Sequence, residues 1–404
     1  MSFEVINFGC RLHIAEGEAI RAAAGDQGDL IVINTCAVTA EASRQARQAV
    51  RRAARRRPDA RIIVTGCAAQ IDPAMFAGMA QVVGNRDKGL ASAYRPFETL
   101  GIAETLSPAI SGADHARAFI EVQNGCDHRC TFCIIPYGRG DSRSIPAGAV
   151  IDAVKLAIDR GQQEVILTGV DLTSYGPDLP GAPSLGQLVE RILTHVPALK
   201  RLRLSSLDSV EIDERLFELI TGEPRVMPHI HLSLQSGDDM ILKRMKRRHS
   251  RAQAVALVDR IKSRRPEIAI GADIIAGFPT EDEAMFTRSL VLLDDCDIVF
   301  GHIFPYSPRE GTPAARMPQL DRSVIKARAE TLRTAAATRK SNWLQTLVGT
   351  RQDVLIELDG KSGHAPNFAH VSLAGEPANT NMRGQMMTLQ ITASDGTMLT
   401  GTRV

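Results

Sequence analysis

Short apolar runs alternate with helical patterns along most of this 404-residue chain, and this alternation constrains the fold more than any other feature. In the first hundred residues, strands are expected at 5–8, 30–33 and 61–65, with a helix over 41–57 between the last two. Strands joined through a helix run parallel, because such a crossover returns the chain to the same end of the sheet. The N-terminal part is therefore predicted to be a βαβ domain with a parallel sheet.

A longer series of strand–helix units follows residues 97–117, whose weak periodicity is typical of a connection between domains. The predicted strands are 118–123, 164–168, 202–205, 229–234, 268–275 and 297–304, and the predicted helices are 147–160, 211–220, 252–264 and 281–293. Six strand–helix repeats fit a partial (β/α)6 barrel better than a complete eight-unit barrel.

A Pro-rich stretch at 305–318 leads into a polar helix predicted over 321–344, after which the pattern changes. Short strand-like runs at 354–358 and 387–391 lie between Gly, Asn and Asp turns, as expected of a small all-β barrel. The chain is thus predicted to be an α/β protein with domains at 1–105, 112–342 and 343–404.

The charge of the chain is nearly balanced, with 48 Lys and Arg against 46 Asp and Glu, so composition alone does not indicate a nucleic-acid-binding protein. The N-terminus lacks the basic and apolar regions of a secretory signal, and no apolar run approaches the roughly 20 residues that span a bilayer. We therefore expect a soluble, cytoplasmic protein that does not enter a membrane.

Seven cysteines in a long chain without a secretory signal favour metal or redox chemistry over a disulfide framework. Three of them, Cys126, Cys130 and Cys133 (the first triplet), follow the first predicted strand of the second segment. Three thiolates in one loop can hold an iron–sulfur cube and leave one iron open for a small molecule. The alternative is structural zinc, which needs a fourth ligand, such as His128.

Cys10, Cys36 and Cys67 (the second triplet) are far apart in sequence, but each comes directly after a predicted strand. Because the carboxyl ends of parallel strands share one edge of the sheet, the three thiolates are expected to converge. The alternative is three unrelated buried cysteines, since free Cys is among the most buried residue types. Cys296, the seventh, is expected to be a packed thiol outside both groups.

The string NGCDHRCTFCIIPYGRG at 124–140 resembles the radical S-adenosylmethionine methylthiotransferases. NTCAVT at 34–39 and TGCAAQ at 65–70 resemble the N-terminal domain of that family, although His13 stands where the family usually has Asn. The resemblance implies a radical-generating 4Fe–4S cluster on the first triplet, whose open iron binds S-adenosylmethionine, and an auxiliary 4Fe–4S cluster on the second triplet. The cofactors would carry the radical chemistry, while the protein positions and shields them.

Polar or small residues at the ends of the predicted barrel strands are candidates for binding S-adenosylmethionine, although a structural role is as plausible for each of them. These candidates are Gly169, Ser205, Ser206, Gln235 and Asp273.

Two basic clusters could neutralise phosphates, although a charge run is more often a solvated surface. One spans 243–251, where one arginine could instead face the cofactor, and the other comprises Arg44, Arg47, Arg51, Arg52, Arg55, Arg56, Arg57 and Arg61. Residues 363–368 resemble a loop of the small TRAM β-barrel of RNA-modifying enzymes. From Trp343 onward, however, four basic residues stand against five acidic ones. RNA contact is therefore expected mainly on the basic surfaces upstream.

Within the family, HLSLQSG at 231–237 resembles the group that acts on threonylcarbamoyl-adenosine in tRNA. This resemblance implies insertion of sulfur and a methyl group at C2 of that nucleoside, beside the anticodon. The implied partners are the tRNA anticodon stem-loop and an electron donor such as flavodoxin or ferredoxin, without DNA. The alternatives are a methylthiotransferase for isopentenyl-adenosine, one for an aspartate of ribosomal protein S12, and a zinc-stabilised RNA-binding protein.

Overall fold

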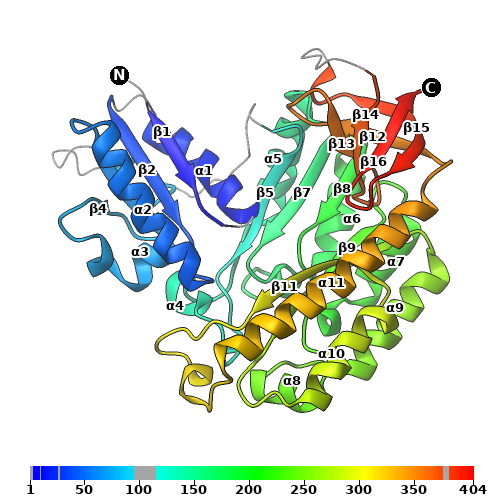
Figure 1. Ribbon diagram of the computed structural model, residues 1–404. Helices are drawn as coiled ribbons and strands as arrows, with labels where there is room; N and C mark the ends of the chain where they lie inside the picture. The colour runs from blue at the N-terminus through cyan, green and yellow to red at the C-terminus, as the bar shows by residue number, and fades with distance from the viewer. Residues whose placement is uncertain (1–2, 10, 26–27, 95–114, 376–381) are drawn as a thin grey trace.

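The computed structural model describes residues 3–9, 11–25, 28–94, 115–375 and 382–404 (Figure 1). A parallel sheet with its helices, drawn in blue, lies beside a larger central sheet that curves into a partial barrel. A small closed barrel, drawn in orange and red, packs against one end of the central part. Among the described residues, no helix combines the length and the apolar composition that a bilayer span requires.

The N-terminal sheet has four parallel strands in the order β1 (Glu4–Asn7), β2 (Leu30–Thr35), β3 (Arg61–Gly66) and β4 (Gln81–Val82). Its main helices are α1 (Arg11–Ala24), α2 (Ala40–Arg56) and the short α3 (Cys67–Ile71). The Thr39 hydroxyl accepts a hydrogen bond from the Ala42 amide and caps α2, which explains why the predicted helix begins there. Helix α1 packs against both this sheet and the central one, and Ala15 lies against Phe119 and Ile166.

Six parallel strands form the central barrel: β5 (Ala118–Asn124), β7 (Glu164–Gly169), β8 (Arg201–Leu204), β9 (His229–Gln235), β10 (Ala269–Ala276) and β11 (Ile298–Pro305). The short β6 (Arg143–Ser144) pairs antiparallel with β5. Only isolated bridges, such as Leu207 to Leu232, join β8 to β9. The predicted partial barrel is therefore confirmed, with one weakly joined seam.

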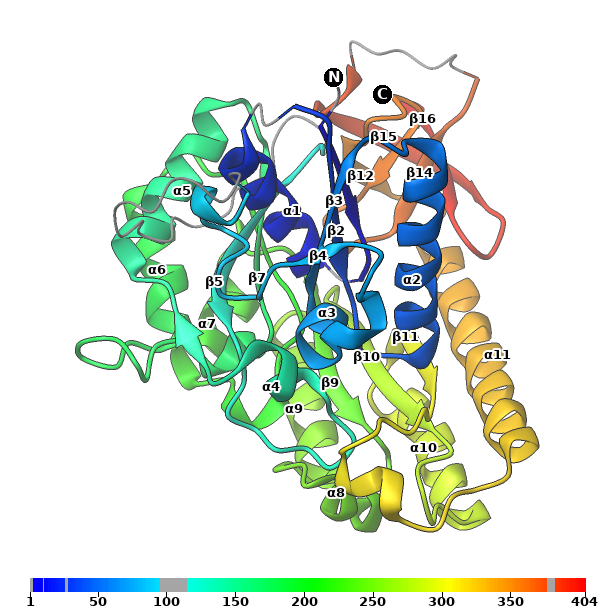
Figure 2. The ribbon, with the colours of Figure 1, turned by 90° about the vertical axis from the view of Figure 1, so that its left-hand side faces the viewer.

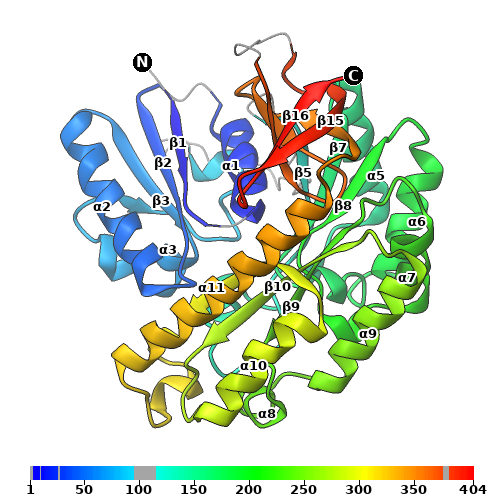
Figure 3. The same cartoon turned by 45° about the vertical axis from the view of Figure 1, so that its right-hand side comes forward.

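Helices cover the outside of this barrel (Figure 3). They are α5 (Ala147–Asp159), α6 (Leu185–His195), α7 (Glu214–Gly222), α9 (Arg251–Arg264), α10 (Glu283–Asp295) and α11 (Arg322–Thr346), with the short α4 (Ile135–Arg139) and α8 (Asp239–Met245) at the carboxyl ends of the strands. Alternate strand residues, such as Leu232, Ala272 and Ile274, lie in one core with the helices. The predicted helix 211–220 was placed three residues too early, because Asp213 caps the true first turn of α7.

The small barrel closes through β12 (Arg351–Ile356), β13 (Ser362–His364), β14 (His370–Leu373), β16 (Leu399–Arg403) and β15 (Met386–Ser394), as predicted. Its β13–β14 loop covers the amino ends of the central strands. Phe368 stacks on His229 with ring centroids 4.9 Å apart, and the Arg203 guanidinium lies 5.0 Å from the phenyl centroid. Arg203 also donates hydrogen bonds to the carbonyls of Pro366 and Ala365, so this end of the partial barrel is closed.

Candidate functional site

The first triplet lies in the loop that follows β5. Cys126, Cys130 and Cys133 are each half-buried, and the Cys133 amide donates a 3.0 Å hydrogen bond to the Cys130 carbonyl. Gly125, at φ +74°, opens this loop, and a Cβ on it would lie 1.9 Å from the Asp141 carbonyl oxygen. Burial raises the pKa of the Cys133 thiol to about 12. Three half-buried thiols in one loop are the donor set of an iron–sulfur cluster, so the loop fits a cluster.

Charged side chains from the next strand ends surround this loop. His128 Nε2 lies 3.0 Å from Asp171 Oδ2, just beyond β7. Arg247, which follows α8, donates to Asp208 beyond β8 at 2.9 Å and lies 3.7 Å from Cys130 Sγ. The expectation that one arginine of the second basic cluster faces the cofactor thus has a candidate in Arg247. Asp171 and Asp208 were not singled out from the sequence, although their position just after predicted strands was a usable signal.

Two cysteines of the second triplet lie at the same edge of the N-terminal sheet, after paired strands. Cys36 follows β2 and Cys67 follows β3, and both are buried. Cys10 lies outside the described residues, but a Cβ on its neighbour Gly9 would stand 3.1 Å from Cys36 Cβ. Gly9 therefore lies beside Cys36. The shared site of all three cysteines stays a prediction.

The loop of the first triplet adjoins Cys67 of the second, which the sequence did not indicate. Helix α4, directly after Cys133, packs against α3, which begins at Cys67 (Figure 2). A Cβ on Gly138 would lie 3.3 Å from Cys67 Cβ, so the absence of a side chain at position 138 favours this close approach. Arg139 ends α4 and donates its Nε–H to Cys67 Sγ at 3.2 Å. One short helix thus links the two cysteine loops.

Arg139 also belongs to a buried ion-pair network between the N-terminal sheet and the central barrel. Its guanidinium binds both carboxylate oxygens of Glu16, whose side chain is 2% exposed. Lys88 Nζ lies 2.7 Å from the same carboxylate. Burial alone would raise the pKa of Glu16, but the charges of Arg139 and Lys88 hold it well below its usual range. Glu16 is therefore ionised and fixes the arginine beside Cys67.

The predicted cofactor-binding residues occupy different positions at the strand ends. Gly169 ends β7 and packs closely on Gln123, while Gln235 ends β9 at φ +68°. Ser205 is buried, and its Oγ has no hydrogen-bond partner in the described part of the chain, whereas Ser206 is exposed. An unpaired buried hydroxyl is costly, so Ser205 fits a ligand contact better than Ser206 does. Asp273 lies deeper, within β10.

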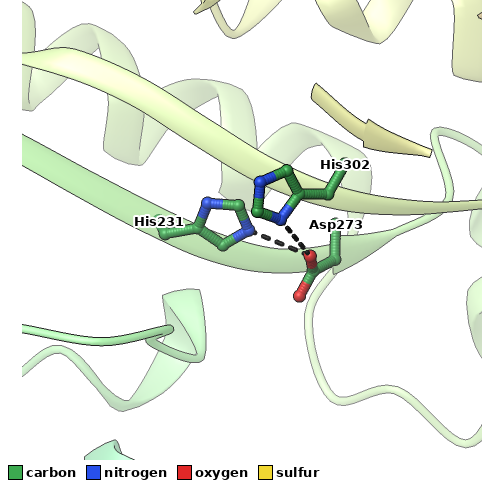
Figure 4. Close-up of side chains that lie close together, drawn as sticks. All are labelled: His231, Asp273 and His302. Carbon is green, nitrogen blue, oxygen red and sulfur yellow. Dashed lines mark hydrogen bonds and ion pairs between the residues drawn. The ribbon is translucent and has the colours of Figure 1, made fainter. Parts of the chain in front are cut away.

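Asp273 joins two histidines from the neighbouring strands (Figure 4). His231 Nε2 on β9 and His302 Nδ1 on β11 lie 3.0 and 3.4 Å from the same carboxylate oxygen. Burial would raise the pKa of Asp273, but hydrogen bonds from both imidazoles hold it well below its usual range. The three ligand atoms lie close enough together to chelate an ion, as do those of His128, Asp208 and Glu211.

A cavity of about 560 Å³ lies elsewhere, between α1 and the edge formed by β5 and β6. Its lining includes Glu16, Lys88, Glu121 and Asn124, and none of the described cysteines. Because the cavity borders the Arg139 network rather than either triplet, we do not place the reaction there.

The basic clusters differ in what their charges contact. On α2, Arg47, Arg51, Arg52 and Arg55 are exposed and have no ion-pair partner among the described residues. In contrast, the four arginines at 243–251 all have partners within the protein. Arg244 donates to the Thr280 carbonyl. The other three form ion pairs, Arg247 with Asp208, Arg248 with Glu211 and Arg251 with Asp295. The α2 face is therefore available to phosphates, whereas the second cluster holds the strand-end loops together.

Comparison with known proteins agrees with this architecture. Residues 120–293 match the radical SAM superfamily, and residues 3–84 match a family described as uncharacterized protein family UPF0004. The radical S-adenosylmethionine methyltransferase TsrM from Kitasatospora setae shares the fold, with a TM-score of 0.55 and 14% identity over 78% of this chain and 75% of that one.

Two relatives in sequence are more informative. The threonylcarbamoyladenosine tRNA methylthiotransferase MtaB of Rickettsia prowazekii is 48% identical over 92% of this chain and 91% of its own length. The tRNA-2-methylthio-N(6)-dimethylallyladenosine synthase of Nitratidesulfovibrio vulgaris is 30% identical over 96% of this chain and 94% of its own. The chain therefore belongs to the radical S-adenosylmethionine methylthiotransferase family, in the group of the MtaB threonylcarbamoyladenosine tRNA methylthiotransferases.

Proposed function

We propose that this protein inserts a methylthio group at C2 of threonylcarbamoyl-adenosine beside the tRNA anticodon. The observation that carries the proposal is the junction of the two cysteine triplets through α4, because a sulfur insertion needs a radical source and a sulfur site close together. The substrate follows the name of the relative at 48% identity, compared with 30% for the dimethylallyladenosine enzyme.

The cofactors are 4Fe–4S clusters and S-adenosylmethionine, which supply the radical chemistry and the methyl group when bound. In this proposal the first triplet holds the radical-generating cluster, and the second triplet, including Cys10, holds the auxiliary cluster. We place S-adenosylmethionine at the strand-end candidates Gly169, Ser205, Ser206, Gln235 and Asp273, among which the buried and unpaired Ser205 hydroxyl has the best support. The N-terminal domain covers 1–105, the radical domain 112–342 and a TRAM-like domain 343–404.

The protein's own residues position these groups and exclude water. The Arg139 guanidinium donates a hydrogen bond to Cys67 Sγ, and the Arg247 guanidinium donates one to Cys130 Sγ. Hydrogen bonds to cluster sulfurs are among the factors that set reduction potentials. His128 is braced by Asp171 and Glu211, which raise its pKa to about 10, so it is cationic within the loop. Phe368 and Arg203 close the far end of the barrel against solvent.

The substrate is tRNA, and we place its phosphates on the exposed arginines of α2, with the small C-terminal barrel as a second contact. The closed five-stranded topology and the loop at 363–368 support a TRAM-like role for that barrel. A small electron donor, such as flavodoxin or ferredoxin, would reduce the cluster in the cytoplasm.

Reconstituted enzyme tests the proposal directly. The protein is incubated without oxygen with S-adenosylmethionine, a reductant, a sulfide source and an anticodon stem-loop that carries threonylcarbamoyl-adenosine. We expect a nucleoside heavier by one methylthio group in place of one hydrogen, formed by wild type and by Cys296→Ala but not by Cys126→Ala. Product formed only on an isopentenyl-adenosine stem-loop, or by none of the proteins, would contradict the proposal.

A further inference from the structure

The loop between β11 and α11, residues 306–321, joins the central barrel to the N-terminal domain. Its Ala314 amide donates a 2.9 Å hydrogen bond to the carbonyl of Thr131, within the loop of the first triplet. Earlier in the same loop, Arg309 Nη2 donates a 3.3 Å hydrogen bond to the hydroxyl of Ser43 on α2. One loop of the barrel domain therefore contacts the chain near both cysteine triplets.

The contact with Ser43 places Arg309 near Cys36 of the second triplet. Ser43 lies in the first turn of α2, and its amide donates to the carbonyl of Thr39, the capping residue. Cys36 precedes that cap by three residues, and both Cys36 and Ser43 are buried. Burial lowers the pKa of the Arg309 guanidinium, and negative charge on Cys36 raises it. The two groups thus lie close enough to interact, and arginine remains cationic in proteins.

The Arg309 guanidinium has donors to spare. Its Nε is buried without a hydrogen-bond partner, and its side chain forms no ion pair within the ranges that the structure describes. Thr312 fixes the backbone at this point, because its amide and its hydroxyl both donate to the Arg309 carbonyl, at 3.0 and 2.7 Å. A half-buried cation without a counter-ion is costly. The loop therefore holds a cationic donor in position for an anionic group.

A cluster on the second triplet is such an anion. A 4Fe–4S cluster with three thiolate ligands carries net negative charge, and reduction by one electron adds another. Net charge and hydrogen bonds to the sulfurs are among the factors that set its potential. Arg139 of α4 already donates to Cys67 Sγ, and Arg309 brings a second guanidinium, near Cys36. The central domain thus supplies cations to a site whose cysteines all belong to the N-terminal domain.

We propose that Arg309 is a positioning residue of the auxiliary site, whose guanidinium stabilises the reduced form of the cluster on the second triplet. This inference rests on the proposed function, and it extends the auxiliary site to a loop of the other domain. The electron comes from the external donor. Arg309 contributes charge and hydrogen bonds, and no bond to it is made or broken.

The test is a redox titration of the anaerobic holoenzyme with dithionite, followed by electron paramagnetic resonance. Added S-adenosylmethionine should change only the signal of the radical-generating cluster, which assigns the two signals. In Arg309→Gln the auxiliary cluster should be roughly tenfold harder to reduce, a potential about 59 mV lower for one electron. The potential of the radical-generating cluster should stay the same.

Two further variants separate charge from structure. Arg309→Lys keeps the charge and should recover at least half of the shift. Arg316→Gln, at an exposed arginine of the same loop, should leave both potentials at their wild-type values. If Arg309→Gln loses the second cluster while Arg309→Lys keeps it, the requirement for a cation is also supported.

An unchanged auxiliary potential in Arg309→Gln, or an equal shift of both clusters, would overturn the inference. Loss of the second cluster from both Arg309 variants would also overturn it, because the loop would then have a structural role only. Failure of the proposed function gives a different result. Wild type would then hold about four irons per chain instead of the eight of two 4Fe–4S clusters.

Discussion

Arg139 is the residue at which the two cysteine loops and the domain interface meet. Its guanidinium contacts Cys67 Sγ, both oxygens of Glu16 and Asn124 Oδ1, and its side chain is 3% exposed. Removal of this buried arginine takes away one of the two cations that offset Glu16, and it leaves Cys67 Sγ and Asn124 Oδ1 without their donor. Lys88 alone would then face Glu16.

Replacing Arg139 with Gln should therefore cost about 3–5 kcal/mol of unfolding free energy, the usual penalty for breaking a buried pair. Anaerobic urea unfolding of the holoenzyme measures this loss. Arg215→Gln is the control, because Arg215 pairs with Glu190 at the surface, where both side chains are more than 40% exposed. It should change stability little. An Arg139→Gln protein as stable as this control would mean that the network does not hold the domains together.

At the scale of elements, the closed barrel docks on the central strands through a second buried ion pair. Glu164, at the start of β7, is fully buried and lies within 3.6 Å of Arg203, Arg117 and Arg201. Burial would raise the pKa of Glu164, but these arginines lower it to about 2 from an ordinary value of 4.5. Arg203 also donates a hydrogen bond to the Pro366 carbonyl in the β13–β14 loop. Through Arg203, the Glu164 carboxylate therefore helps to hold the closing loop in place.

Because its pKa is lower in the folded state, Glu164 stabilises fully above about pH 4.5, and this contribution is lost as the pH falls toward 2. The gap between the two values corresponds to about 3 kcal/mol. Glu164→Gln should lose a similar amount at pH 7, and the difference from wild type should shrink in acid. Urea unfolding of the cluster-free proteins between pH 7 and pH 3 measures it. A difference that stays constant with pH would contradict the assignment.

At the scale of the whole molecule, tRNA is expected to bind along α2. Of its exposed arginines, Arg51 and Arg55 are unpaired among the described residues, whereas Arg44 and Arg56 pair with Glu41 and Glu4.

The double variant Arg51→Gln, Arg55→Gln should weaken tRNA binding and reduce the slope of log affinity against log salt by about 1.5, from two lost phosphate contacts. The matched double variant Arg44→Gln, Arg56→Gln, in which the paired arginines are removed, should change the slope less. Filter binding at several salt concentrations gives both slopes. If the two double variants gave equal slopes of log affinity against log salt, the exposed arginines of α2 would not be the tRNA-binding surface.

Much of this architecture follows from local pattern. The main strands and the closed C-terminal barrel were predictable from hydrophobic periodicity and turn residues. The approach of Cys36 to Cys67 was predictable because each follows a buried strand of one parallel sheet. The contact of Arg139 with Cys67 was not, since the two are 72 residues apart and meet only when two domains dock. His302 was also missed. His302 is a single polar residue in an apolar strand, and its contact with Asp273 and His231 depends on the alignment of β9, β10 and β11.

The proposed activity of this protein is methylthiolation of threonylcarbamoyl-adenosine in tRNA, with a cluster on the first triplet. The most direct measurement is mass spectrometry of tRNA nucleosides from a strain lacking this gene, alone or complemented with wild type or Cys126→Ala. We expect the methylthio form of threonylcarbamoyl-adenosine to disappear in the deletion strain and only wild type to restore it. Unchanged tRNA nucleosides in the deletion strain would contradict it, and would direct attention to the aspartate of ribosomal protein S12.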